Sequence, residues 1–147
     1  MKVLLYVDDA ADDLLLFESA CRIARIPFEL RTAEGSAEGL AYVGGQGRYA
    51  DRLRHPPPDA VLCDIKMRGP DGFEVLARIR SDPATARLPV VLFTASVLPA
   101  DAQRGLAQGA TACISKPVEL ARTVALALGV CLEGGEWEER LRPFTAG

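Results

Sequence analysis

Asp59-Ala-Val-Leu-Cys-Asp64 is a short apolar run that ends in a carboxylate, a pattern typical of a buried strand with a polar group at its C-terminal end. Other apolar runs in the chain also lead directly into polar residues. These are residues 2–7 before Asp8 and Asp9, residues 89–93 before Thr94, and residues 112–114 before Ser115, Lys116 and Pro117. Helical patterns flank each run, which favours parallel strands that are buried on both faces.

The polar residues that follow these runs are expected to meet. Strands of an open parallel sheet with right-handed crossovers all end along one edge. Residues 28–32 alternate apolar and polar side chains and predict a fifth strand, at the side of the sheet. Strand and helix patterns alternate five times, which predicts a doubly wound α/β fold with helices on both faces. We therefore expect one crevice that is lined by Asp8, Asp9, Asp64, Thr94 and Lys116.

The length and composition of the chain indicate one folded domain. Its 147 residues are enough for one sizeable core and too few for two. Apolar residues make up 49% and charged residues 25%, with a formal net charge of -3, which is typical of a soluble globular protein. We assign residues 1–128 to this domain and residues 129–147 to a C-terminal tail with a short amphipathic helix. Trp137 in that helix either covers the domain's own surface or contacts a partner.

Charge and hydropathy argue against several classes of function. The arginines are scattered singly among acidic residues, whereas a nucleic-acid-binding domain concentrates them on one face. No apolar stretch is long enough for a membrane span and no signal peptide precedes the first strand, so we expect a cytoplasmic protein. Because Met1 stands directly before that strand, we expect the chain to be complete. The four cysteines lack the spacing of zinc or redox motifs and are expected to be reduced and mostly buried.

Three local features complete the expected element order. Asp12 or Asp13 is expected to cap a helix that ends before Pro27. Residues 44–58 are rich in Gly, Pro and Arg and predict a surface loop with a turn of helix at residues 49–53; His55 in this loop is expected to be solvated and without a role. After the last strand, residues 118–128 predict a helix.

Three converging carboxylates repel one another. At about 4 Å and an effective dielectric of about 20, each like-charged pair costs about 4 kcal/mol. A hard divalent cation relieves that cost, and Mg²⁺ binds one or two carboxylates together with a backbone carbonyl and several waters. The cluster of Asp8, Asp9 and Asp64 therefore predicts a magnesium site.

Lys116 and Thr94 add a second kind of chemistry to this crevice. An ammonium and a hydroxyl that face a metal-bound carboxylate form a pocket for a group with several anionic oxygens, such as phosphoryl. Asp64 can then attack phosphorus and form an aspartyl phosphate. Taken singly, each residue has a simpler explanation, because acidic residues often cap helices and a strand-terminal Thr or Lys is usually just exposed. Their joint arrangement favours phosphoryl chemistry.

Residues 2–128 resemble the receiver domains of bacterial two-component response regulators. The resemblance rests on several motifs that occur in the right order: Tyr-Val-Asp8-Asp9, Leu-Cys-Asp64-Ile-Lys-Met with Asp71-Gly72, Phe-Thr94-Ala-Ser, and Ser-Lys116-Pro117. It implies a flavodoxin-like, receiver-type sheet of five parallel strands in the order 2-1-3-4-5.

The resemblance also implies a role for each motif residue. Asp64 accepts a phosphoryl group from a sensor histidine kinase. Asp9, Asp64 and the backbone carbonyl of Lys66 bind Mg²⁺ directly, and Asp8 contributes mainly through water. Thr94, Ala95 and Lys116 bind the phosphoryl oxygens. The peptide bond between Lys116 and Pro117 is cis.

Two positions depart from the family pattern. Most receivers have a proline after the Met of the phosphorylation loop, where this chain has Arg68, so we expect a loop of different shape. Cys113 stands where the family has Tyr or Phe, a ring that changes its burial as the threonine moves toward the phosphoryl group. A thiol is too small for that movement, which predicts another route for the signal or a weaker signal.

The long segment of residues 44–58 and the lack of an output domain resemble the single-domain regulators that accompany bacterial phytochromes. This predicts a stand-alone receiver whose partner is a sensor kinase of that type, with no enzymatic activity beyond self-phosphorylation and autodephosphorylation. It would signal by protein contact through its fourth and fifth helices. The small residues at 100–107 fit either a homodimer on that face or close packing on the sheet.

Two alternatives remain open. One is a degenerate receiver that acts as a phosphate-independent adaptor, which Arg68 and Cys113 favour and the complete set of pocket residues disfavours. The other is a phosphotransferase enzyme with an aspartyl-phosphate intermediate. Such enzymes usually carry a second Asp two residues after the first, where this chain has Lys66.

Overall fold

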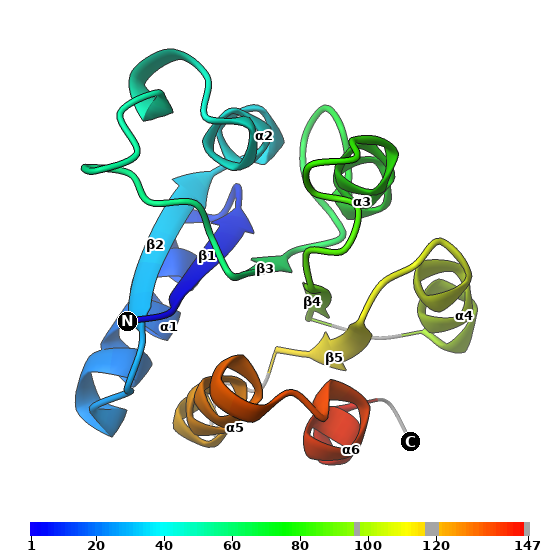
Figure 1. Ribbon diagram of the computed structural model, residues 1–147. Helices are drawn as coiled ribbons and strands as arrows, with labels where there is room; N and C mark the ends of the chain where they lie inside the picture. The colour runs from blue at the N-terminus through cyan, green and yellow to red at the C-terminus, as the bar shows by residue number, and fades with distance from the viewer. Residues whose placement is uncertain (96–97, 117–120, 146–147) are drawn as a thin grey trace.

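Within residues 1–95, 98–116 and 121–145, which the computed structural model describes, five parallel strands are covered by helices on both faces (Figure 1). The strands are β1 (Val3–Asp8), β2 (Glu29–Glu34), β3 (Ala60–Cys63), β4 (Val90–Thr94) and β5 (Ala112–Ser115). The helices are α1 (Ala11–Ala24), α2 (Ser36–Gly44), α3 (Gly72–Ser81), α4 (Pro99–Ala107), α5 (Ala121–Gly134) and α6 (Trp137–Leu141), with 3₁₀ turns η1 (Gly47–Tyr49) and η2 (Arg142–Phe144). None of the described helices is long and apolar enough to cross a membrane.

The sheet has the strand order β2-β1-β3-β4-β5, and all neighbouring strands are parallel. This order confirms the predicted doubly wound fold and places β2 at one side of the sheet, as expected from its alternating pattern. In the register of the sheet, Val7 pairs with Cys63 and Thr94 pairs with Ser115. The residues that follow these pairs therefore leave the sheet side by side, along one edge.

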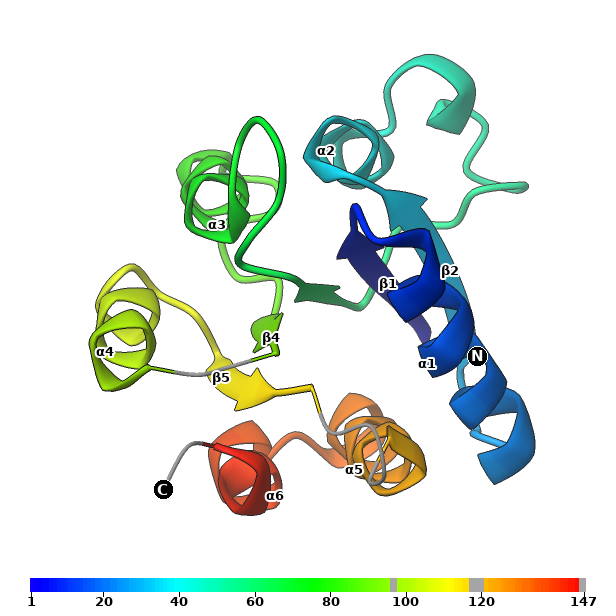
Figure 2. The same cartoon turned by 180° about the vertical axis from the view of Figure 1, so that it is seen from behind.

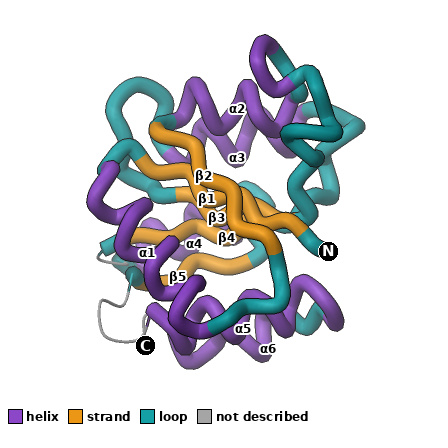
Figure 3. Tube along the Cα trace, turned by 90° about the vertical axis from the view of Figure 1, so that its left-hand side faces the viewer, coloured by secondary structure: helices purple, strands orange, loops and turns teal. Residues whose placement is uncertain are grey.

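Two apolar layers hold the helices against the sheet. Successive side chains of a strand point to opposite faces, so each buried strand contributes to both layers. Leu4 and Leu62 belong to the layer beneath α1 and α5, whereas Leu5 and Leu92 belong to the layer beneath α2, α3 and α4. Figure 2 shows the same arrangement from behind, and Figure 3 shows helices on both sides of the strands.

The four cysteines lie within these layers as free, buried thiols, as the sequence predicts. Burial is the main cause that raises the pKa of Cys21 to about 12 and the pKa of Cys113 to about 11. Both thiols therefore stay protonated at neutral pH and have little nucleophilic character.

The start of α1 differs from the expectation. The helix follows Ala10, which makes no side-chain cap, so that Asp12 and Asp13 both lie in the first turn. The prediction that one of them caps the helix is therefore wrong. The carboxylate of Asp8 supplies a bond there instead, because its Oδ1 accepts the backbone N–H of Ala10 at 2.9 Å.

The segment between α2 and β3 is more ordered than its composition suggests. Its helical turn is η1, slightly earlier than the predicted turn at residues 49–53. His55 was expected to be solvated, but its ring packs edge-on against Tyr49 at 5.0 Å and Tyr42 at 6.0 Å. These aromatic contacts hold the segment against α2, where it forms the bulge above β2 in Figure 1.

The residues assigned to a C-terminal tail pack on the domain. The predicted helix end at Leu128 is wrong, because α5 runs on to Gly134. Gly129 allows this continuation, since the backbone there lies so close to Pro27 that an added Cβ would be 3.2 Å from its Cδ. Leu141 of α6 is fully buried in the layer beneath α1 and α5, and Trp137 packs against the same layer. Of the two readings of Trp137, the structure shows the one in which it covers the domain's own surface.

This packing predicts that the C-terminal segment stabilises the domain. Replacing Leu141 by Ala should lower the free energy of unfolding by about 2–4 kcal/mol, because it leaves a cavity in the core. Urea unfolding followed by circular dichroism measures the change. Leu53→Ala is the matched control, since Leu53 is 96% exposed and should leave the stability unchanged. Equal stability of the Leu141 variant and the native protein would mean that α6 is not docked.

Candidate functional site

The C-terminal ends of β1 and β3 bring three carboxylates together. One oxygen each of Asp8, Asp9 and Asp64 lies within 4.8 Å of the others. Asp8 is the last residue of β1, and Asp64 directly follows β3, the neighbouring strand. The predicted convergence of these residues is confirmed.

Asp8 is the most deeply buried member of the cluster and accepts three hydrogen bonds. Its Oδ2 accepts the hydroxyl of Tyr6 at 2.7 Å and the ammonium of Lys116 at 2.6 Å, while its Oδ1 accepts the N–H of Ala10. A charge without solvent contact requires such partners. Tyr6 lies two residues before Asp8 on the same face of β1, so burial and this bond raise the pKa of Tyr6 far above its usual range.

Lys116 is the cation at the centre of the site. Its Nζ lies 2.6 Å from Asp8 Oδ2, 2.9 Å from Asp13 Oδ2 and 3.4 Å from Asp64 Oδ2. Burial lowers the pKa of the ammonium, but the hydrogen bonds to Asp8 and Asp13 outweigh this effect and the pKa is raised. Lys116 is therefore charged throughout the physiological range, and one positive charge serves three carboxylates.

The surroundings of Asp64 shift the pKa of its carboxylate. Burial raises the pKa of Asp64 to about 6; Lys116 opposes this rise and the negative charge of Asp8 adds to it. Its Oδ1 accepts the N–H of Ile65 at 2.9 Å, which leaves Oδ2 facing Lys116. A carboxylate held in this way is both costly to ionise and oriented toward a cation.

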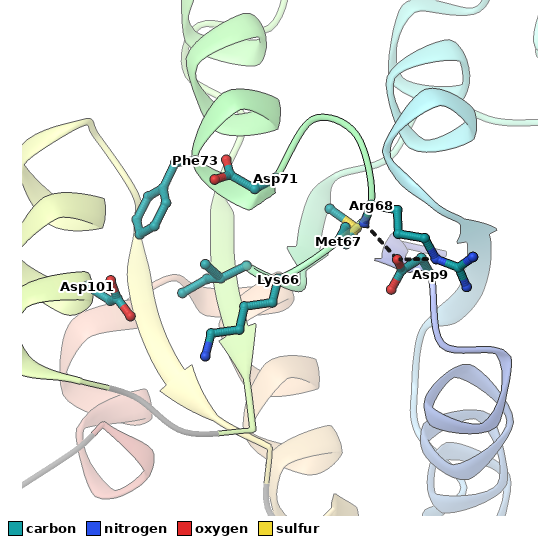
Figure 4. A pocket seen from close by; sticks show the side chains of 8 residues that line it. Asp9, Lys66, Met67, Arg68, Asp71, Phe73 and Asp101 are labelled. Atoms are coloured by element: carbon teal, nitrogen blue, oxygen red, sulfur yellow. Dashed lines mark hydrogen bonds and ion pairs between the residues drawn. The ribbon is translucent and has the colours of Figure 1, made fainter.

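Asp9 stands at the solvent-exposed side of the cluster. Its Oδ2 accepts the backbone N–H of Arg68 at 2.8 Å, and the guanidinium Nε of the same arginine lies 3.8 Å from that oxygen (Figure 4). Both residues line a cavity of about 550 Å³ at the mouth of the site, together with Lys66 and Asp71. Figure 4 shows the side chain of Lys66 directed away from Asp9.

The remaining predicted residues lie at the same edge or outside the described segments. Thr94 ends β4 in a buried position, and its carbonyl accepts the N–H of Lys116 at 2.7 Å. Ala95 follows it and is exposed. Pro117 and its predicted cis bond lie outside the described residues. Cys113 is buried in the layer beneath α4, and its role as an atypical switch position stays a prediction.

Two members of the site were not predicted from the sequence, Tyr6 and Asp13. Asp13 was interpreted as a helix cap, yet its side chain reaches Lys116 from the first turn of α1. Asp13 could have been predicted, because a helix that starts directly after β1 has its first turn at the crevice. Tyr6 could have been predicted, because residues two apart in a strand point to the same face as each other.

The donor set fits a divalent cation with oxygen ligands. The carboxylates of Asp9 and Asp64 are hard oxygen ligands of the kind that Mg²⁺ or Mn²⁺ requires. The loop between β3 and α3 begins at Asp64, so its backbone carbonyls are further oxygen ligands nearby. Asp8 already accepts three hydrogen bonds, which favours an indirect contribution from this residue. A cation would also balance the excess of carboxylates over Lys116.

The charge excess predicts that Asp64→Asn stabilises the metal-free protein by about 1–3 kcal/mol at pH 8. The pKa of Asp64 is raised in the folded state, so its ionised form destabilises the fold above pH 6. That penalty fades as the pH falls from 6 to the ordinary value of 3.8, and the gain from Asn should fade with it. Urea unfolding in chelator between pH 4 and pH 8 measures this dependence.

Lys116 keeps Asp8 and Asp13 as partners in this variant, so no buried cation is left unpaired. Glu133→Gln provides a control for the loss of one exposed negative charge. A lower stability of Asp64→Asn than of the native protein at pH 8 would contradict the predicted repulsion.

Comparison with known proteins identifies the family. A model of the response regulator receiver domain matches residues 4–127. Response regulator Rcp1 of Synechocystis sp. is 34% identical over 95 residues, which are 65% of this chain and 63% of Rcp1, so the chain spans less than two thirds of this relative. 

Solved structures agree with the sequence match. The phosphorylated cyanobacterial phytochrome response regulator RcpA is similar with a TM-score of 0.79 and 27% identity, covering 90% of this chain and 94% of RcpA. The Mn²⁺-bound form of Rcp1 is similar with a TM-score of 0.73 and 26% identity, covering 84% of this chain and 91% of Rcp1. These matches and the strand order confirm the resemblance that the motifs indicated. The chain belongs to the response regulator receiver domain family.

Proposed function

We propose that this protein is a phosphoacceptor response regulator in which Asp64 receives a phosphoryl group from a sensor histidine kinase. The observation that carries this proposal is the position of the Asp64 carboxylate. It faces the half-buried ammonium of Lys116 at 3.4 Å and belongs, with Asp8 and Asp9, to the acidic cluster that suits a divalent cation. This combination binds a phosphoryl group and presents a nucleophile to it.

The transfer step follows from these positions. An oxygen of the ionised Asp64 carboxylate attacks phosphorus and forms an acyl phosphate. The bond between phosphorus and the imidazole nitrogen of the kinase's phosphohistidine breaks, and its electron pair stays on the imidazole. Oδ1 of Asp64 is held by the N–H of Ile65, which fixes the orientation of the carboxylate before the reaction.

Lys116, Thr94 and Ala95 are proposed to hold the oxygens of the bound phosphoryl group. The ammonium of Lys116 offers charge-assisted hydrogen bonds, the hydroxyl of Thr94 a neutral one, and Ala95 a main-chain N–H. The main-chain bond between Lys116 and Thr94 keeps the two residues adjacent at the ends of β5 and β4. In the absence of phosphoryl, Asp8, Asp13 and Asp64 satisfy the ammonium instead.

Asp9, Asp64 and the backbone carbonyl of Lys66 are the proposed ligands of Mg²⁺, with Asp8 acting through water. When bound, the cation would neutralise carboxylate and phosphoryl oxygens that otherwise repel each other. The Mn²⁺-bound structure of Rcp1 supports a divalent cation in this family. The crowding of carboxylates around a single lysine supports it for this chain.

The relatives support a more specific setting. RcpA is a phytochrome response regulator, so a phytochrome-type sensor kinase is the proposed partner of this chain. We propose that the protein acts in the cytoplasm through protein contacts, without nucleic acid or membrane as a partner, and that its own catalysis is limited to self-phosphorylation and autodephosphorylation. A homodimer on the surface of α4 and α5 stays part of this proposal. Residues 1–128 are proposed as the receiver unit, with the last turns of α5 and α6 packed on it as part of the same fold.

Intact mass spectrometry after incubation with acetyl phosphate and Mg²⁺ tests the proposal. The native protein should gain the mass of one phosphoryl group, and chelator should prevent the gain. Asp64→Asn should abolish it, whereas Asp12→Asn, which alters an exposed aspartate in the first turn of α1, should not. A folded native protein that gains no mass would favour the phosphate-independent adaptor, and a gain that persists in Asp64→Asn would show a different acceptor.

A further inference from the structure

The loop between β3 and α3 makes a contact with the acidic cluster that involves Arg68. The backbone N–H of Arg68 donates to Asp9 Oδ2 at 2.8 Å, and the guanidinium Nε lies 3.8 Å from the same oxygen. Figure 4 shows both dashed contacts from Arg68 meeting at the same oxygen of Asp9. One residue thus offers Asp9 both a main-chain donor and a positive charge.

This contact depends on the residue type at position 68. The resemblance to receivers places a proline there in most relatives, and proline has neither an N–H nor a charge. Gly69, which follows, has a φ of 72°, a left-handed conformation that suits glycine and turns the chain at this point. A proline at position 68 would make neither of the two contacts with Asp9.

Arg68 also completes the charge pairing of the cluster. Lys116 pairs with Asp8 and Asp64, but among the described residues its ion pairs do not include Asp9. Arg68 is the basic residue that pairs with Asp9 in this part of the chain. Its side chain is 95% exposed, so the attraction is weak and sensitive to salt.

We propose that Arg68 is a positioning residue that holds Asp9 when no divalent cation is bound and competes with that cation for the carboxylate. The guanidinium is a positive charge on a proposed metal ligand, so a second cation binds Asp9 less tightly while it is present. The inference rests on the metal site of the proposed function. Its consequence is a lower metal affinity than the same carboxylates would otherwise give.

The variants separate the charge of Arg68 from the shape of the loop. Arg68→Gln removes the guanidinium and keeps the backbone N–H, and Arg68→Lys keeps a positive charge. Arg54→Gln is a matched control, because Arg54 is 84% exposed and its Nε lies 3.9 Å from Asp51 Oδ2 in the segment before β3. The distance in that pair is nearly the same as the 3.8 Å between Arg68 and Asp9. The pair lies before the N-terminal end of β3, whereas Arg68 follows the C-terminal end of that strand.

Isothermal titration of Mg²⁺ into the metal-free protein provides the readout. At low ionic strength Arg68→Gln should bind about two- to fivefold more tightly than the native protein, a change of the size expected for an exposed ion pair. Arg68→Lys should resemble the native protein, and Arg54→Gln should not change the affinity. The gain of Arg68→Gln should shrink at about 1 M salt, where the Debye length is about 3 Å.

The other outcomes overturn the inference in distinguishable ways. Equal or weaker binding by Arg68→Gln, with a native protein that binds Mg²⁺, overturns the role of Arg68 and leaves the metal site intact. Tighter binding by Arg68→Lys or Arg54→Gln to the same extent shows that a local positive charge at position 68 is not the cause. A native protein that binds neither Mg²⁺ nor Mn²⁺ overturns this inference together with the proposed metal site.

Discussion

Repulsion among Asp8, Asp9 and Asp64 is the constraint to which the rest of the site responds. Like charges within 4.8 Å of each other cost several kcal/mol in a protein, and Asp13 adds a further carboxylate beside Lys116, which already pairs with Asp8 and Asp64. The structure meets this cost in a different way at each residue. Asp8 is buried and takes three hydrogen bonds, whereas the burial of Asp64 raises its pKa to about 6. Asp9 keeps contact with solvent and with Arg68.

The topology of the sheet makes these compensations available. Lys116 and Asp8 are 108 residues apart in the chain, and only the neighbouring positions of β1, β3, β4 and β5 bring them together. Lys116 follows β5, a strand at the side of the sheet with a partner on one side alone. The C-terminal segment supports that strand, because the hydroxyl of Ser115 donates to the carbonyl of Phe144 at 3.3 Å and Leu141 fills the layer beside it. The segment beyond residue 128 thus anchors the strand that carries the site's cation.

The sequence predicted the site residues that directly follow strands. The apolar runs and the parallel topology are enough to place Asp8, Asp64 and Lys116 at one edge of the sheet, without any knowledge of side-chain contacts. It did not predict contacts that depend on exact geometry. Asp13 fits a helix cap as well as a lysine partner in the sequence, and the bond between Arg68 and Asp9 requires the conformation of a loop. The end of α5 was missed because Gly129 and Gly134 look like helix breakers, although Gly129 lies where the helix packs tightly against Pro27.

Lys116 and Arg68 both pair with carboxylates of the acidic cluster, and they differ in burial. This difference decides which carboxylate can give up its cationic partner more easily. The side chain of Lys116 is 14% exposed and that of Asp8 is fully buried, so the bond between them acts in a low dielectric and is costly to break. Arg68 is almost fully exposed, so water and salt already weaken its hold on Asp9. A cation that binds this cluster would therefore displace Arg68 from Asp9 far more readily than Lys116 from Asp8. Asp9 is the carboxylate that can exchange partners at low cost, and Asp8 is the one that keeps Lys116 in place while it does so.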